Sequence, residues 1–187
     1  MRRQLLPALR MLLVMTLLCG VTYTAAVTVL AQTLFEERAN GSLVYRDGEV
    51  VGSELLGQSF QGPGYFHSRP SAVDYDPRLS GATNYGPNHP EHLATVAERA
   101  TAYRQANRLD TNMPIPVDAV TASASGLDPH ISVANARLQA ARVAQERELP
   151  LEQVLAFIEE QTSTASVTYL SDATVKVLQL NLALDER

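Results

Sequence analysis

The segment TASASGLDPHIS, residues 121–132, brings together the side chains Ser123, Ser125, Asp128 and His130. These are the residue types of the nucleophile, acid and base of a serine hydrolase, which folding normally collects from distant parts of a chain. A G-x-S-x-G turn would expose such a nucleophile, and the sequence contains none. The Asp128-Pro129 pair is instead typical of a helix entrance, because aspartate accepts from free backbone N–H groups and proline has none to leave unpaired. We predict this structural role, with Ser132 as a second capping residue. A membrane-anchored hydrolase using Ser123 or Ser125 with His130 is the alternative.

Metal and nucleotide chemistry have little support in the sequence. His89 and His92 are three residues apart, but two ligands fall short of the three or four that zinc takes. The one lysine, Lys176, lies in no glycine-rich phosphate loop, and the DKTGT motif of P-type pumps is absent. His67 beside Arg69 could contact an anion or a partner carboxylate; alternatively, Arg69 pairs locally. We therefore assign no catalytic residue, no metal ligand and no cofactor-binding residue to this chain.

An uncharged apolar run extends over residues 11–35. About 20 apolar residues in a helix cross the ~30 Å hydrocarbon core of a bilayer, so we predict one transmembrane helix. The three arginines at positions 2, 3 and 10 place residues 1–10 in the cytoplasm and residues 36–187 in the periplasm, by the positive-inside rule. One alternative is a signal peptide cleaved after Ala31, although signal peptides have apolar regions of only about 7 to 15 residues. A lipid anchor on Cys19 is another, but that cysteine follows leucines rather than small residues.

Small and hydroxyl residues recur within the apolar run. Such residues let membrane helices approach one another and form hydrogen bonds in lipid. They fit a face that packs against other membrane helices, and they fit ordinary scatter in a lone anchor equally well. The residues are Thr16, Gly20, Thr22, Tyr23, Thr24, Ala25, Ala26 and Thr28.

Length and charge limit the nature of the chain beyond the apolar run. The 187 residues leave room for one domain in addition to the membrane helix. The net charge is −5, and it becomes −8 once the three N-terminal arginines are set aside, which argues against a nucleic-acid partner. The one cysteine lies in the apolar run, so a packed core rather than a disulfide must stabilise residues 36–187.

The first part of this domain contains one regular element followed by a long irregular segment. Residues 42–45 and 49–55 flank Asp47-Gly48, a pair favoured in tight hairpin turns, so we predict a β-hairpin. Residues 61–92 are rich in glycine, proline and asparagine and show no period. Loops of this length are usually functional or disordered, and four aromatic residues favour order. They are Tyr65, Phe66, Tyr75 and Tyr85.

Helical signals dominate the second part. We predict helices from Pro90 to about Asn107, from Ser132 to about Glu148, and from Pro150 to about residue 162, with an extended segment over residues 113–123. In the first helix, one apolar stripe has helical spacing. It consists of Leu93, Val96, Ala97, Ala100 and Tyr103. Leucines alternate with other residues over 178–184, so we predict a strand over residues 174–184. The fold class is therefore α+β: one N-terminal transmembrane helix followed by a single extracytoplasmic mixed α/β domain.

Several sequence blocks occur in a characteristic order behind the apolar run. They are GSELLGQSF, GYFHSRPSA, SGATNYGPN, VTASASGLDPHIS, ARVAQER and VLQLNLALD. Together they resemble the C subunit of the bacterial Kdp potassium-transporting ATPase complex, and the resemblance covers essentially the whole chain. Ala124 departs from it, because the family usually has glycine there.

The resemblance implies a non-catalytic subunit of a high-affinity K+ uptake pump in the inner membrane. Its partners would be a channel-like potassium-binding subunit, a P-type ATPase subunit and a small single-helix subunit, besides membrane lipid. ATP and K+ would be bound by the complex, and the C subunit would assist assembly and raise the ATP affinity of the ATPase subunit as a catalytic chaperone. A periplasmic ligand-binding module, based on the aromatic loop from Gly64 to Tyr85, is a further alternative.

The distinctive blocks also supply the residues that we expect to form an interface or a structural motif. These candidates are Tyr65, Phe66, His67, Arg69, Pro70, Asn84, Gly86, Pro87, Ser125, Gly126, Asp128, Pro129 and His130.

Overall fold

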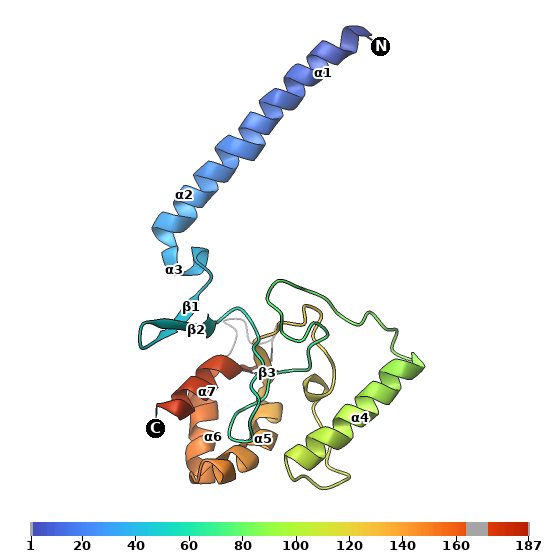
Figure 1. Ribbon diagram of the computed structural model, residues 1–187, viewed down its shortest axis with the longest axis vertical. Helices are drawn as coiled ribbons and strands as arrows, with labels where there is room; N and C mark the ends of the chain where they lie inside the picture. Colours follow the sequence, from blue (N-terminus) through green and yellow to red (C-terminus); the bar gives the residue numbers. More distant parts are fainter. Residues whose placement is uncertain (1, 164–171, 187) are drawn as a thin grey trace. The chain divides into compact units, whose positions relative to one another are not determined.

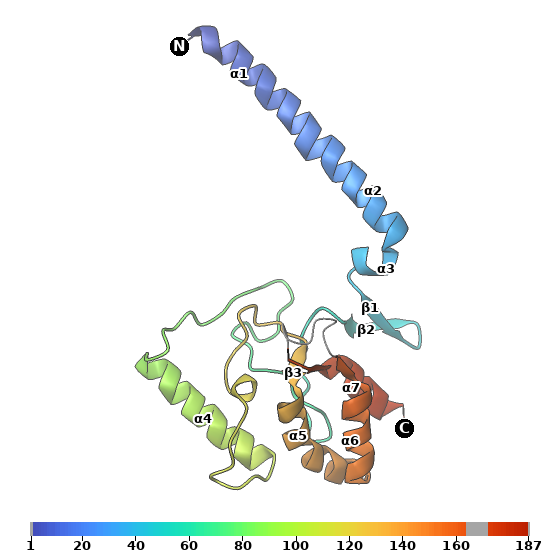
Figure 2. The same cartoon turned by 180° about the vertical axis from the view of Figure 1, so that it is seen from behind.

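A computed structural model describes residues 2–163 and 172–186 of the chain. The chain divides into two compact units, residues 1–51 and residues 52–187. The first unit holds the apolar helix and most of a hairpin, and the second holds the mixed helix and strand region (Figures 1 and 2). The α+β class predicted from the sequence is confirmed.

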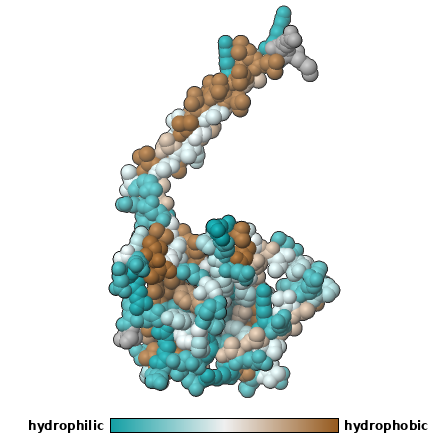
Figure 3. All heavy atoms as spheres, in the orientation of Figure 1, coloured by the Kyte–Doolittle hydropathy of each residue, from teal (hydrophilic) through white to brown (hydrophobic). Residues whose placement is uncertain are grey.

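The first unit is dominated by one long helix built from three consecutive segments. They are α1 (Arg2–Met15), the π-helical η1 (Thr16–Tyr23) and α2 (Thr24–Leu34). Within the described residues, Arg3–Leu34 is the one helix long and apolar enough to cross a membrane, and its side chains are exposed (Figure 3). The Thr24 hydroxyl donates to the Cys19 carbonyl, five residues back, at 3.3 Å. This spacing follows the wider i→i+5 turn of a π-helix.

A short turn and a hairpin follow the long helix. The one-turn helix α3 covers Glu36–Ala39, and the strands β1 (Leu43–Arg46) and β2 (Glu49–Ser53) form the predicted hairpin. Asp47 and Gly48 have φ angles of 53° and 84°. Positive φ at both central residues is the requirement of a type I′ turn, which explains why this pair marks the hairpin in the sequence.

The second unit packs three helices against a small sheet. The antiparallel sheet has the order β3-β5-β4, with β3 at His130–Ser132, β4 at Thr162–Ser163 and β5 at Thr174–Lys176. Ile131 pairs with Val175 across the centre of the sheet. The helices are α5 (Val133–Glu146), α6 (Leu151–Glu160) and α7 (Val177–Asp185), and α6 contacts both of the others. Their buried apolar side chains form one core, which also includes Phe66 from the long irregular segment.

Helix α4 (Pro90–Ala106) lies at the edge of the second unit, away from α6 (Figures 1 and 2). Its start is as predicted, because His89 is extended and Pro90 occupies the first turn. Its apolar stripe does not reach the core: Leu93 is 55% exposed and α4 contains no buried residue. Polar contacts hold the helix instead, including the Tyr103 hydroxyl, which donates to the Asn135 side-chain oxygen at 2.8 Å.

The predicted strand over residues 174–184 is wrong beyond Lys176. Only Thr174–Lys176 is a strand, and α7 begins at Val177. Buried positions in α7 include Val177, Leu180 and Leu184, which have the spacing of one helix face. The stretch after Val177 contains leucine, glutamine and alanine but no β-branched residue, so its intrinsic preference is helical.

The predicted extended segment over residues 113–123 contains one helical turn. The 3₁₀ turn η2 covers Val117–Ala119 and begins directly after Pro116. Proline fixes φ near −65°, a value that is compatible with the entry to such a turn.

Candidate functional site

The YFHSRPS segment has no regular secondary structure, yet the backbone N–H and carbonyl groups of Phe66 and His67 are all hydrogen-bonded. The Asn181 side-chain amide accepts from the Phe66 N–H at 2.8 Å and donates to the Phe66 carbonyl at 2.9 Å. Gln139 does the same for His67, at 2.8 and 3.1 Å. Both amides are 1% exposed, so these bonds replace the strand partner that a buried extended segment would otherwise need.

Two arginines hold the beginning of the same segment. Arg142 donates to the carbonyls of Pro63 and Tyr65, and Arg147 donates to the carbonyl of Gly64 at 2.6 Å. The Arg147 guanidinium also lies 4.7 Å from the centre of the Tyr65 ring and bonds Asp185 at 2.6 Å. Side chains from α5, from its C-cap Arg147 and from α7 therefore fix residues 63–67 in one conformation.

Hydrogen bonds join the SGLDPHIS block to this segment and to the loops before and after it. The Gly57 N–H donates to the Leu127 carbonyl at 2.8 Å, and the Gly81 N–H donates to the Ser125 carbonyl at 3.0 Å. The Ser71 hydroxyl donates to the Gly126 carbonyl at 2.7 Å. We call residues 57, 65–71, 81 and 123–130 the motif cluster, because these parts of the distinctive sequence blocks meet there.

The motif cluster leaves room only for glycine at two positions. A Cβ on Gly57 would lie 2.5 Å from the Asp128 carbonyl oxygen, which is backbone and cannot yield. Gly126 has a φ of +72°, and a Cβ there would lie 2.6 Å from a Val73 methyl group. Close approach of another backbone therefore explains Gly57, and a positive φ together with crowding by Val73 explains Gly126.

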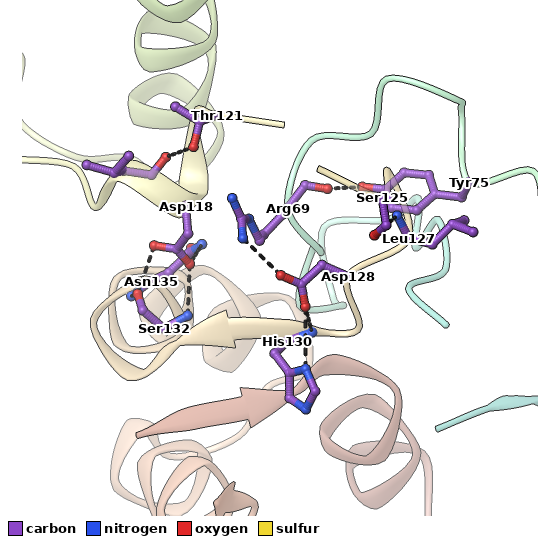
Figure 4. Close-up of polar contacts among 11 residues, drawn as sticks. Arg69, Tyr75, Asp118, Thr121, Ser125, Leu127, Asp128, His130, Ser132 and Asn135 are labelled. Atoms are coloured by element: carbon purple, nitrogen blue, oxygen red, sulfur yellow. Dashed lines mark hydrogen bonds and ion pairs between the residues drawn. The ribbon is translucent and has the colours of Figure 1, made fainter. Parts of the chain in front are cut away.

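Asp128 joins residues 123–130 of the motif cluster to residues 65–71 (Figure 4). One carboxylate oxygen accepts from Arg69 at 2.9 Å, and the other accepts from the His130 N–H at 3.0 Å. The His130 ring Nδ1 lies 3.4 Å from the same carboxylate. Partial burial raises the pKa of Asp128, but hydrogen bonds from His130 and Arg69 outweigh it and lower this pKa to about 2. The carboxylate is therefore charged throughout the neutral pH range.

The predicted helix cap at Asp128 is wrong, and the second predicted cap is confirmed. Asp128 closes a turn onto His130, which begins strand β3 rather than a helix. Ser132 is the N-cap of α5, where its hydroxyl accepts from the Asn135 N–H at 3.0 Å. Strand β3 begins directly after the Asp-Pro pair and ends at the capping residue, Ser132.

Ser123 and Ser125 form hydrogen bonds with neighbouring parts of the motif cluster. The Ser125 hydroxyl accepts from the Leu127 N–H at 3.1 Å, which is a turn contact. Ser123 is buried, and its N–H donates to the Pro70 carbonyl at 3.4 Å. Within residues 2–163 and 172–186, no hydrogen bond joins either serine to His130. The geometry of a nucleophile activated by a histidine is thus missing from the part of the chain that the structure describes.

His67 and Arg69 differ in the charge that they carry. Burial lowers the pKa of the His67 imidazole, although the ring Nε2 contacts the Gly62 carbonyl at 3.0 Å. His67 is therefore neutral at pH 7 and offers no positive charge to an anion. Arg69 forms an ion pair with Asp128, which lies 59 positions away in the sequence.

Asn84, Gly86 and Pro87 lie outside the motif cluster. They belong to an exposed loop that leads into α4. Tyr85 orders this loop: its ring stacks on His89 with centroids 4.5 Å apart, and its hydroxyl donates to Glu91 at 2.7 Å. The remaining predicted candidates, from Tyr65 to Pro70 and from Ser125 to His130, do come together.

Sequence reasoning missed Asp118 and the residues it holds. Its carboxylate accepts from the Ser132 N–H at 2.8 Å, from the Ser132 hydroxyl at 2.9 Å and from the Asn135 amide at 3.0 Å (Figure 4). Burial, and then the charge of Asp118, raise the pKa of the nearby Tyr103 hydroxyl. An isolated aspartate in an irregular segment carries no sequence signal for such a role.

A pocket of about 260 Å³ lies between α4 and α5. Small side chains such as Ala102 and Ala106 line it, together with Arg99 and the buried amides of Asn135 and Gln139. Among the described residues, no group of three or more histidine, cysteine, aspartate and glutamate side chains could hold a metal ion.

Comparison with known proteins assigns this chain to a family. The model of the KdpC family, "K+-transporting ATPase, c chain", matches residues 5–186. The chain belongs to the KdpC family. It is 52% identical over 187 residues to the "Potassium-transporting ATPase KdpC subunit" of Mycobacterium tuberculosis strain H37Rv, covering 99% of each chain. It is 51% identical to the subunit of the same name from Rhodospirillum rubrum, covering 100% of this chain and 97% of the relative.

KdpC membership makes this chain an accessory subunit of a potassium-transport complex, in which the catalytic residues lie on another chain. The predicted family is confirmed. Membership also implies that this chain has other subunits of the Kdp complex as partners.

Proposed function

We propose that this chain assembles with a channel-like potassium-binding subunit, a P-type ATPase subunit and a small single-helix subunit. In that complex it supports assembly and acts as a catalytic chaperone that raises the ATP affinity of the ATPase subunit. The observation that carries the proposal is the match to the KdpC family over residues 5–186.

The proposed topology is a single-pass protein of the inner membrane. Residues 1–10 lie in the cytoplasm, residues 11–35 cross the bilayer, and residues 36–187 form the periplasmic domain. The 32-residue apolar helix, with its exposed side chains, supports a membrane span. Its small and hydroxyl residues fit contacts with other membrane helices. A cytoplasmic effect on ATP affinity must then pass through this helix or its N-terminal end, because the domain lies on the other side of the membrane.

The motif cluster is the proposed interface for the channel-like subunit. Its backbone is held by Asn181, Gln139 and Arg142, and its ion pair between Arg69 and Asp128 is only partly buried. Both ion-pair side chains remain 25% exposed. A surface that is rigid before contact loses little conformational entropy on binding, which favours a stable subunit interface. The exposed loop with Asn84, Gly86 and Pro87 would extend this contact.

The experiment that tests the proposal compares purified complexes with and without this chain. The complex that contains the chain should be intact and should show a lower KM for ATP in a K+-stimulated ATPase assay. An Asn84→Ala/Pro87→Ala variant perturbs the exposed loop without touching the core, so it should weaken assembly while the domain stays folded. An intact, fully K+-stimulated complex that lacks the chain would contradict the proposal.

A further inference from the structure

The hairpin of the first unit exposes an apolar face. Alternate residues of a strand share a face, and the two-residue turn places Tyr45 opposite Val50. Leu43, Tyr45 and Val50 therefore lie on one side of the hairpin, and they are 37%, 62% and 54% exposed. The neighbouring α3 does not cover Leu43 and Tyr45, since a hollow of about 380 Å³ lies between these two residues and Glu36 and Glu37. Figure 3 shows apolar side chains gathered at this hairpin.

A compact linker holds the hairpin close to the end of the apolar helix. The Ser42 N–H donates to the Glu37 carbonyl at 2.9 Å, so the chain folds back on α3 before β1 begins. Gln32, in the last turn of α2, donates to the Asn40 side-chain oxygen at 3.3 Å. One turn of helix rises only ~5 Å, so β1 starts within roughly 10 Å of the last apolar residues, Leu34 and Phe35.

This distance matches the polar layer of a bilayer. The headgroup region extends about 5 to 8 Å beyond the hydrocarbon on each side, which is the layer that the hairpin reaches if the apolar helix spans the membrane. Tyrosine is enriched at this depth, because its ring is apolar and its hydroxyl is polar. A two-stranded hairpin is also marginal in water by itself, so burying one face would stabilise it.

We propose that the β1–β2 hairpin is an interfacial anchor, with Leu43, Tyr45 and Val50 seated in the lipid headgroup layer next to the transmembrane helix. The inference rests on the proposed membrane span. The ligand class is the zwitterionic lipid surface rather than an anionic one, since three glutamates and one aspartate outnumber two arginines over residues 36–49. The anchor would fix the depth and rotation of the helix at the outer surface.

The chain contains no tryptophan, so a single introduced tryptophan reports on one position. We would reconstitute the full-length chain in phosphatidylcholine nanodiscs as three variants. Tyr45→Trp probes the apolar face, Glu49→Trp probes the opposite face of the hairpin, and Leu18→Trp probes the middle of the helix. Emission wavelength, quenching by brominated lipid and quenching by aqueous iodide are measured for each variant.

The anchor predicts blue-shifted emission from Tyr45→Trp, with strong quenching by lipid brominated near the headgroup and weak quenching by iodide. Glu49→Trp should show the reverse. Equal iodide quenching of both, with Leu18→Trp quenched by lipid, would overturn the anchor and leave the membrane span standing. Lipid quenching that is absent even from Leu18→Trp would refute the span itself. Shielding of Tyr45→Trp only in the assembled complex would assign this face to a partner chain and overturn the lipid assignment.

Discussion

Replacing Asp128 by Asn should make the domain less stable at neutral pH and less sensitive to acid. The substitution keeps an oxygen that can accept from the His130 N–H and removes the charge that Arg69 binds. The folded-state pKa of Asp128 is about 2, against an ordinary value of 3.8. This difference corresponds to about 2 kcal/mol of unfolding free energy, reduced toward about 1 kcal/mol by solvent screening of a partly exposed pair.

The sign of the pH dependence is set by the direction of this shift. Because the folded-state pKa of Asp128 is depressed, its contribution is complete above the unfolded-state pKa of 3.8. The contribution disappears as the pH falls from about 4 toward about 2, and roughly half of it is lost by about pH 3. The wild-type chain should therefore lose more stability than Asp128→Asn between about pH 5 and pH 3.

Urea unfolding of the detergent-solubilised full-length chain, followed by circular dichroism at several pH values, measures both effects. Asp76→Asn is the matched control, since Asp76 also pairs with an arginine, but its partner Arg78 has an 86% exposed side chain. Its effect at neutral pH should be small, because exposed ion pairs contribute little. Identical pH profiles for the wild type and Asp128→Asn would refute the assignment of the ion pair as a link between residues 65–71 and residues 123–130 of the motif cluster.

Three further substitutions test the same architecture. Asn181→Leu leaves two buried backbone groups unpaired and should cost about 3 kcal/mol in urea unfolding, whereas the exposed Asn112→Leu should cost little; equal effects would contradict the amide clamp. Gly126→Ala should lower stability by at least about 1 kcal/mol because of its positive φ and the crowded Cβ position, while Gly86→Ala, which has open space around it, should melt like the wild type. The wild-type chain should not be labelled by a covalent serine probe, and labelling that is lost in Ser125→Ala would speak for the hydrolase alternative.

Local signals predicted the elements whose geometry depends on neighbouring residues. Asp47-Gly48 specified the hairpin because both positions need positive φ. Ser132 and Pro90 marked the starts of α5 and α4, since a side-chain acceptor and a missing N–H each satisfy the needs of a helix N-terminus.

The failures have two causes. Leucine alternation over residues 178–184 fits a strand period and a helix face equally in so short a stretch, and the helical preference of its residue types was the signal that the prediction did not use. Gln139 and Asn181 look like ordinary polar residues of helices in the sequence. Their function in holding the YFHSRPS backbone emerges only when residues separated by 72 and 115 positions are brought together.

The central claim is that this KdpC-family chain acts as an accessory subunit within a potassium-transport complex. The most direct measurement is affinity purification of the chain from membranes of its own host grown at limiting K+, with mass spectrometry and a K+-stimulated ATPase assay. Our account predicts co-purification of a P-type ATPase subunit and a channel-like subunit with K+-stimulated activity. Recovery of the chain alone, from membranes in which the other subunits are present, would contradict it.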